Sequence, residues 1–428
     1  MTTTEPVDIE TVEDFRERAR KFIRENVPPA GGPQVAGNLS DEEELADVSR
    51  QRQLQRLLYD GGLAGVLVPR EYGGQGLTLD HVRALNEEMA GRQYPFRLQV
   101  PGMTPCMTIL LDFGTEEQKR QHVPAILRGD EIWMQMLSEP SGGSDVAGAQ
   151  TTALRDGDEW VLNGSKVWTT GAWWSDWALC LTRTNVDVEK HRGLTVFMVP
   201  FDIEGLEMHR IEMLNGSKEF CQEFLTDVRI PDSYRIGEVD DGWTVGTRWM
   251  YYERSYASSP YAILPAGSSL EGDRGVGTMV SLAARSGRLR DPAARALIGE
   301  AHAESIALAH LSKRLPKAIM TRKMTEQAAS IGKLMYALVR RRLMTIGWEL
   351  AGPTAAVWGD DDADLGERGV NFLSRQVGEI AGGTTEMARN VVAERVLGMP
   401  REKTFDKGVA FREIPKGPPA RAREEHQS

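Results

Sequence analysis

"MQMLSEPSGGSDVAG", residues 134–148, stands where the sequence pattern changes from helical to strand-like. Before this segment, apolar residues such as Val12, Phe15 and Ala19 recur every three or four positions, which is typical of amphipathic helices. Inside the segment, Pro140 and the glycines predict a rigid turn that exposes backbone amides. The segment therefore predicts a boundary between a helical region and a sheet.

The region after this turn predicts a β-rich domain. The runs "WALCLTRT" and "LTVFMVP" have the composition of strands, and three dipeptides are typical of tight hairpin turns: Asp156-Gly157, Asn163-Gly164 and Asn215-Gly216. From about residue 242 the pattern is helical again, and Asp291-Pro292 predicts a helix start. One apolar stripe predicts a long packed helix, and it consists of Ala328, Ile331, Met335, Val339, Leu343, Ile346 and Leu350.

We therefore expect an α+β fold class in the order helices, sheet, helices. The predicted parts are an N-terminal all-α domain (1–130), a middle β-barrel or β-sandwich domain (131–240) and a helical domain (241–400). A stretch rich in Ser, Gly and Pro predicts a loop at 257–277. The polar residues 401–428 are typical of a disordered tail or of a segment that docks on a partner.

Composition excludes several function classes. The net charge of −11 argues against a general nucleic-acid binder. The three cysteines are far apart, so neither a zinc site nor a disulfide framework is expected, and a reducing compartment is indicated. The polar opening residues and the lack of an apolar run of about 18 residues predict a cytoplasmic protein without a transmembrane segment.

Two further segments have the composition of a ligand site. "NGSKVWTTGAWWSDW" (163–177) offers the flat face of Trp168 and neighbouring threonine hydroxyls. "GEIAGGTTEMARN" (378–390) places two glycines before a Thr-Thr pair that can cap the next helix. Each segment read alone is more typical of a structural turn or a core tryptophan, so the site hypothesis depends on their combination.

Together with "VPREYGGQG" (68–76), these segments resemble the acyl-CoA dehydrogenase family over about residues 10–400. The resemblance implies an N-terminal helical domain, a β-domain and a C-terminal four-helix bundle. It also implies FAD, bound between the β-domain and the bundle. The positions that match the family's FAD contacts are Leu137 and Ser138 at the pyrimidine edge, Ser144 at the pyrophosphate, Trp168, Thr169 and Thr170 beside the isoalloxazine, and Gly383, Thr384 and Glu386 in the C-terminal segment.

The family's reaction needs a carboxylate to remove the α-proton of an acyl thioester. Many members carry this glutamate immediately before a Gly-Thr pair, where this chain has Gly382. A subset that includes the isovaleryl-CoA and long-chain enzymes places it on the first helix of the C-terminal domain, before an arginine. Glu253-Arg254 in "RWMYYERSYASS" (248–259) matches that motif. The resemblance thus implies that Glu253 is the base and that Gly382 leaves room for it, its N–H remaining available to the thioester oxygen.

The substrate implied by the resemblance is an acyl-CoA thioester. Arg254 is assigned either to structure or to support of the active site. Residues beside the base or on the helix around 96–112 are candidates for the acyl pocket or for the core, and they are Tyr251, Tyr252, Met103, Met107 and Leu110.

The chain departs from the family pattern in one place. Many members carry an Arg…Phe-Gly motif that reaches the FAD of a neighbouring subunit, but the segment "TMVSLAARSGRLRDPAARALIGE" has no Phe-Gly. Arg285, Arg288 and Arg290 are candidates for the arginine. A homo-oligomer, dimer or tetramer, is expected, with a heterotetramer as the other possibility.

Three classes of function stay open. The leading hypothesis is a dehydrogenase that passes electrons to an electron-transfer flavoprotein or a similar acceptor. An acyl-CoA oxidase or a flavin monooxygenase would keep the fold and change the chemistry. A non-catalytic subunit would support a partner's site without turnover.

Overall fold

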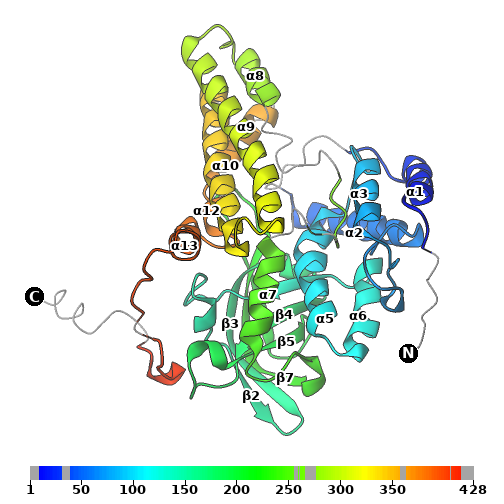
Figure 1. Cartoon of the computed structure of the whole chain (residues 1–428), viewed down its shortest axis with the longest axis vertical. Helices are drawn as coiled ribbons and strands as arrows, with labels where there is room; N and C mark the ends of the chain where they lie inside the picture. Colours follow the sequence, from blue (N-terminus) through cyan, green and yellow to red (C-terminus); the bar gives the residue numbers. More distant parts are fainter. Residues whose placement is uncertain are drawn as a thin grey trace, which may run out of the picture.

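The computed structural model describes residues 9–30, 39–254, 259, 261–265, 276–356, 363–404 and 406–415. Helices at the start of the chain, a sheet in the middle and a helical bundle at the end form three layers of the molecule (Figure 1). The expected α+β class and its order of parts are confirmed.

The N-terminal helices lie against one side of the sheet. They are α1 (Val12–Asn26), α2 (Asp41–Asp60), α3 (Leu79–Glu88), α4 (Phe96–Leu98), a π-helical segment (Gln99–Met107), α5 (Thr108–Phe113) and α6 (Glu116–Arg128). In α2 the buried Glu44 accepts hydrogen bonds from Arg97, from the indole of Trp174 at 3.2 Å and from Arg210 at 3.2 Å. Because Trp174 and Arg210 belong to the middle domain, these bonds tie α2 to it.

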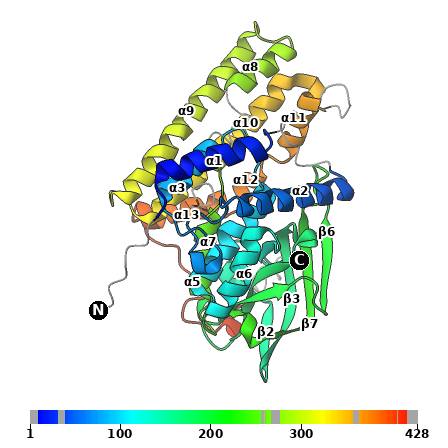
Figure 2. The same ribbon diagram turned by 90° about the vertical axis from the view of Figure 1, so that its right-hand side faces the viewer.

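The described strands form one eight-stranded sheet in the order β6-β7-β3-β2-β4-β5-β8, with β1 paired to β4. The strands are β1 (Trp133–Met136), β2 (Thr152–Asp156), β3 (Glu159–Thr170), β4 (Trp177–Arg183), β5 (Leu194–Pro200), β6 (Leu206–Ile211), β7 (Phe220–Pro231) and β8 (Arg235–Ile236). Figure 2 shows the long strands β3 and β7 side by side. Helices α5 and α6 share a core with the sheet that is centred on Trp133 and Trp249.

One of the three predicted hairpins is wrong. The turn after Asp156 and the turn at Asn215-Gly216 each join two antiparallel strands, but Asn163-Gly164 lies inside β3. There the pairing of β3 with β7 shifts, so the dipeptide forms a β-bulge. Gly164 has φ +153°, and a Cβ at this position would lie 2.5 Å from the hydroxyl of Thr151. Glycine is needed here because Thr151 lies too close to leave room for a side chain. The chain continues along β3 and makes no turn.

The C-terminal helices form a tall bundle above the sheet (Figure 1). They are α7 (Gly242–Arg254), α8 (Val276–Arg285), α9 (Pro292–Met320), α10 (Ala329–Ala351), α11 (Ala363–Leu373), α12 (Val377–Ile380), α13 (Thr385–Val391) and a π-helical turn (Val392–Val396). The predicted start at Asp291-Pro292 is confirmed, since Asp291 caps α9. Most of the predicted loop at 257–277 lies outside the described residues.

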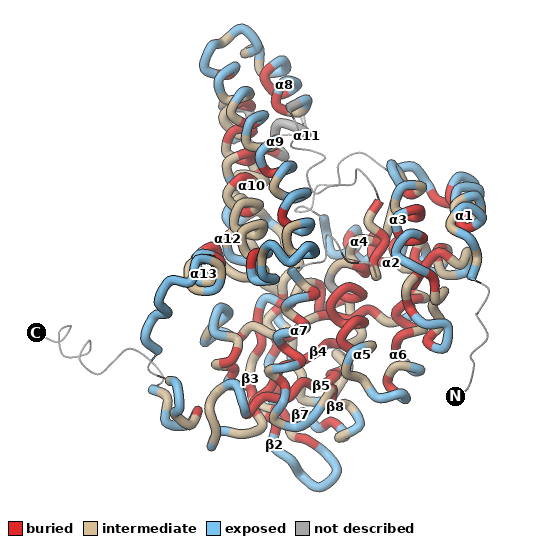
Figure 3. Tube along the Cα trace, in the orientation of Figure 1, coloured by how far each residue is buried: buried red, intermediate tan, exposed pale blue. Residues whose placement is uncertain are grey.

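The apolar stripe of α10 is confirmed. Val339, Leu343, Ile346 and Leu350 are all buried and pack against α8 and α9. Figure 3 shows buried and exposed positions alternating along α9, which is amphipathic, whereas α10 is mostly buried or intermediate.

Part of the tail, around residues 406–414, docks on the middle domain of the same chain, while most of the remaining predicted tail lies outside the described residues. The backbone N–H groups of Phe411 and Arg412 donate to the carbonyls of Val188 and Val186, at 2.8 and 3.0 Å. The ring of Phe411 is buried, and the Arg183 guanidinium lies 3.8 Å from its centroid. Asp406 forms an ion pair with Lys190.

The Phe411→Ala variant should release the tail. The substitution removes a buried ring and its contact with Arg183, so we expect a loss of about 2–4 kcal/mol of local docking free energy. Limited trypsin digestion should then cleave the tail faster, while the midpoint of global urea unfolding changes little. Met399→Ala, at an exposed position just before the tail, is the matched control. Equal cleavage rates in the wild type and Phe411→Ala would contradict the docking.

Candidate active site

The predicted site residues come from three segments. The first is the Ser138 loop, residues 137–151, which follows β1. The second is the end of β3, residues 168–170. The third is the Gly382 loop, residues 381–384, which joins α12 to α13 and lies near the last residues of α7.

A buried ion pair fastens the Ser138 loop to the sheet. Lys166 of β3 donates to the Glu139 carboxylate at 2.8 Å and to the carbonyls of Leu137 and Leu181, at 3.3 and 2.6 Å. The same carboxylate accepts from the N–H groups of Gln150 and Thr151, at 2.6 and 2.9 Å. Both side chains are buried. One charge pair thus fixes both ends of the loop and the adjacent strands.

The pKa of Glu139 reflects this arrangement. Burial alone would raise the pKa, but the charge and hydrogen bond of Lys166 and the N–H group of Gln150 outweigh burial and hold it below its ordinary value. Glu139 is therefore ionised at neutral pH. Ser144, in the same loop, is exposed.

The end of β3 presents alternating faces. Trp168 adopts a left-handed backbone with φ +68°, and its side chain is 52% exposed. A left-handed tryptophan is unusual, because its Cβ crowds the backbone, so the surrounding structure must hold it there. It lies in a second bulge of β3, between Val167 and Thr169. The indole is thus open for a flat ligand, and Thr170 is partly exposed next to it.

Thr169 faces the other way. Its hydroxyl donates to the carboxylate of Glu223 on β7 at 2.8 Å, and both side chains are buried. Only the backbone of Thr169 is left for the predicted contact with a cofactor. The other carboxylate oxygen of Glu223 has no hydrogen-bond partner. Burial raises the pKa of Glu223 to about 8, so this group holds a proton at neutral pH.

The Gly382 loop has the backbone that its glycines predict. Gly382 and Gly383 have φ values of +64° and +94°. The hydroxyl of Thr384 accepts from the N–H of Met387 at 3.1 Å, so Thr384 caps α13 as predicted. A Cβ at Gly382 would meet no atom nearer than Lys333 Cε at 4.0 Å, so the position is open. Glu386, in the first turn of α13, is exposed and pairs with Arg389.

Helix α7 carries Glu253 to this loop. The middle of α7 is fixed to the sheet by the buried Trp249, whose indole N–H donates to Gln135. At its end, the guanidinium of Arg254 lies 3.8 Å from the Cβ position of Gly383. Glu253 is partly buried. Its pKa is raised by burial, and the positive charges of Arg254 and Lys333 oppose the rise. A carboxylate with a raised pKa near an open loop is suited to accept a proton.

The two tyrosines of α7 lie in different environments. Tyr251 is half exposed and lies near the Arg248 guanidinium. Tyr252 lies in the core, and its hydroxyl donates to Asp112 at 2.8 Å. Met103, Met107 and Leu110 are buried in that same core. Four of the five pocket candidates are therefore buried in one core cluster, and a contact of any of the five with substrate stays a prediction.

Three functional candidates are not apparent from the sequence pattern: Lys166, Glu223 and Lys333. Lys166 and Glu223 are charged residues inside strands, where an inward position is visible only once the bulges of β3 set the register. Lys333 lies on α10, but it does not belong to the apolar stripe from which this helix was predicted. Among the predicted arginines, Arg288 is used locally, because it binds Asp291 and the carbonyl of Glu349.

Comparisons with known proteins agree with this fold. The models of the N-terminal, middle and C-terminal domains of acyl-CoA dehydrogenases match residues 9–130, 135–228 and 267–397. "Acyl-CoA dehydrogenase IpdE1" of Mycobacterium tuberculosis is 32% identical over 403 residues, covering 92% of this chain and 99% of its own length. The chain belongs to the acyl-CoA dehydrogenase family. Members of this family are flavoproteins that bind FAD.

Two solved structures are also similar. "Tcur3481-Tcur3483 steroid ACAD" has a TM-score of 0.72 and 26% identity, covering 94% of this chain and all of that chain. The "ChsE4-ChsE5 complex from Mycobacterium tuberculosis" has a TM-score of 0.68 and 24% identity, covering 93% of this chain and 100% of that chain, which supports the fold alone.

The open segments fit FAD. Gly142, within the Ser138 loop, has no atom within 4 Å of its Cβ position, and this loop can offer amides and hydroxyls to a diphosphate. The exposed Trp168 offers a face to a flat ring. Within the described part of the chain, no cluster of His, Cys, Asp and Glu could hold a metal ion, and no helix is long and apolar enough to span a membrane.

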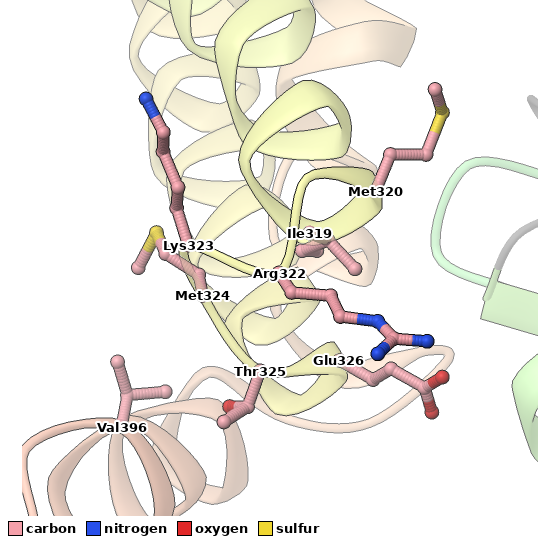
Figure 4. A pocket seen from close by; sticks show the side chains of 8 residues that line it. All are labelled: Ile319, Met320, Arg322, Lys323, Met324, Thr325, Glu326 and Val396. Carbon is pink, nitrogen blue, oxygen red and sulfur yellow. The ribbon is translucent and has the colours of Figure 1, made fainter.

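A separate hollow of about 760 Å³ lies at the α9–α10 turn (Figure 4). Arg322 and Glu326 extend to one side of it, Lys323 and Met324 to the other, and Val396 closes one end. No predicted site residue lines this hollow.

Breaking the buried ion pair should destabilise the protein. Lys166→Met leaves Glu139 charged and buried, so we expect the free energy of unfolding to fall by about 3–5 kcal/mol in urea titrations. A Lys166→Met/Glu139→Gln double variant removes both charges and should recover part of the loss. Arg229→Met, in an exposed ion pair, should cost about 1 kcal/mol or less. Similar losses in Lys166→Met and Arg229→Met would contradict the assigned role.

Glu223 should make stability depend on pH. Between its ordinary pKa of 4.5 and about 8, the folded protein keeps a proton that the unfolded chain releases. The free energy of unfolding should therefore fall as pH rises through this window. Glu223→Gln should flatten that slope in urea titrations at several pH values, whereas Glu207→Gln, exposed on the neighbouring strand β6, should retain it. An unchanged slope in Glu223→Gln would show that Glu223 does not titrate there.

Proposed function

We propose that this protein is an FAD-dependent acyl-CoA dehydrogenase that introduces an α,β double bond into an acyl-CoA thioester, with Glu253 as the base. The observation that carries the proposal is the meeting of two features. Glu253, one residue before the end of α7, is partly buried, and the guanidinium of the next residue, Arg254, lies 3.8 Å from the Cβ position of Gly383 in the open glycine loop. The position where many family members carry their glutamate is a glycine here, so the base comes from the facing helix.

The chain's own residues supply three functions. Glu253 takes the α-proton, because its pKa is raised by burial while neighbouring cations oppose the rise. The N–H of Gly382 binds the thioester oxygen, which becomes negative as the proton leaves. Trp168 and Thr170 border the flat ring, and the Ser138 loop holds the diphosphate. FAD, when bound, accepts the hydride from the β-carbon.

The acyl group and the partners are proposed from the relatives. One similar structure is described as a steroid ACAD, so a polycyclic acyl group is the first substrate class to test. Two similar structures are named as pairs of polypeptides, which supports a heteromer as well as a homo-oligomer. An electron-transfer flavoprotein or a similar protein is the proposed electron acceptor.

Replacing the base should abolish turnover. In Glu253→Gln we expect the rate of flavin bleaching by an acyl-CoA under anaerobic conditions to fall at least about 1,000-fold, because the amide cannot accept the proton. Thioester binding should stay within a few fold of the wild type. Glu117→Gln, exposed on α6, is the control and should bleach at the wild-type rate.

The same experiment separates the alternatives. Bleaching of Glu253→Gln at the wild-type rate would refute the assignment of the base. Rapid reoxidation of the bleached wild type by oxygen would identify an oxidase. If no thioester in a panel of straight, branched and polycyclic acyl-CoAs bleaches the wild type, a monooxygenase or a non-catalytic subunit is favoured.

A further inference from the structure

Lys333 on α10 lies beneath the Gly382 loop. Its ammonium group donates to the carbonyls of Gly378 and Ala381, at 2.8 and 2.7 Å. Its Cε is the nearest atom to the Cβ position of Gly382, at 4.0 Å. One side chain therefore fixes the positions of two carbonyls that precede Gly382 in the sequence, and it limits how far Gly382 can shift.

The same ammonium group acts on Glu253. The charged groups that act on the Glu253 carboxylate are Arg254, on its own helix, and Lys333, from the bundle. The third titratable group that interacts with Glu253 is the buried Cys106 thiol of the π-helical segment, whose pKa is raised by burial and by Glu253. Burial lowers the pKa of Lys333, the charge of Glu253 opposes this change, and Arg340 and Arg254 add to it. Arg254 and Lys333 thus both lie at the glycine loop and act on the base, and Lys333 does so while it holds the carbonyls of Gly378 and Ala381 by hydrogen bonds.

We propose that Lys333 is a positioning residue for the desaturation reaction, which sets the Gly382 N–H through two carbonyls and favours the ionised form of Glu253 through its charge. This inference rests on the proposed function of Glu253. The proton passes from the α-carbon to the Glu253 carboxylate, and Lys333 keeps its own proton throughout. A base that is already protonated cannot react, so the charge on Lys333 increases the fraction of enzyme that is ready for substrate.

A purely structural role makes a different prediction. Lysine side chains commonly bind the last carbonyls of a helix, and α12 ends at Ile380, beside Lys333. Arg341 offers a matched control, because it also ties α10 to α12, through Glu379 at 3.1 Å, and it is not among the cations that act on Glu253. If Lys333 only supported α12, the loss of either cation would have the same effect.

The test compares Lys333→Met, Lys333→Arg and Arg341→Met with the wild type, each as the flavin-loaded protein. Infrared titration follows the carboxyl band that disappears in Glu253→Gln, which reads the protonation of Glu253 without turnover. In Lys333→Met we expect its midpoint to rise by about one pH unit, because the stabilising cation is gone. Lys333→Arg and Arg341→Met should keep the wild-type midpoint. The acidic limb of the flavin-bleaching rate should move upward by the same amount in Lys333→Met.

The outcomes separate the two proposals. An unchanged carboxyl midpoint in Lys333→Met, or an equal shift in Arg341→Met, overturns the role of Lys333, whatever the activity of the wild type. If the wild type fails to bleach with any thioester, the proposed function fails, while the infrared midpoint still decides whether Lys333 controls Glu253. If Lys333→Met does not fold, Lys333→Gln, which can still donate to a carbonyl, carries the same expectations.

Discussion

The buried ion pair between Lys166 and Glu139 is the constraint on which the candidate site depends. A charge inside a protein is costly unless it is paired and hydrogen-bonded, and here the contacts of the pair with Leu137, Gln150 and Thr151 also order the Ser138 loop. Lys166 lies two residues before Trp168, and Glu139 follows Ser138 directly. The pair thus places the end of β3 that is proposed to border the flat ring beside the loop proposed to hold the diphosphate.

The second half of the site is assembled across two layers. Helix α7 is packed against the sheet by Trp249, but its last residues lie against the Gly382 loop of the bundle. Lys333 connects the two, because it binds the loop and acts on the carboxylate. The glycine at 382 has a positive φ and an open Cβ position, so its place in the site can be explained by backbone geometry and by space for another side chain.

The sequence predicted the order of layers, the long apolar stripe of α10 and the cap at Thr384, because these depend on local periodicity and local hydrogen bonds. It failed where tertiary contacts decide. Asn163-Gly164 has the composition of a hairpin, yet the close approach of Thr151 makes it a bulge. That bulge and the next one determine which side chains of β3 point inward, so the orientation of Thr169 toward Glu223 could not be seen from alternation alone. The docking of Phe411 depends on Arg183, more than two hundred residues earlier in the chain.

The docked tail has a mechanical consequence. The helical bundle leaves the sheet through α7 and returns to it when Phe411 seats beside Arg183. It is therefore an insertion anchored at both ends, unlike a module that hangs from a single hinge. Such a domain can rotate about the line through its two attachments. A larger movement of the bundle away from the sheet would first have to break one of these attachments.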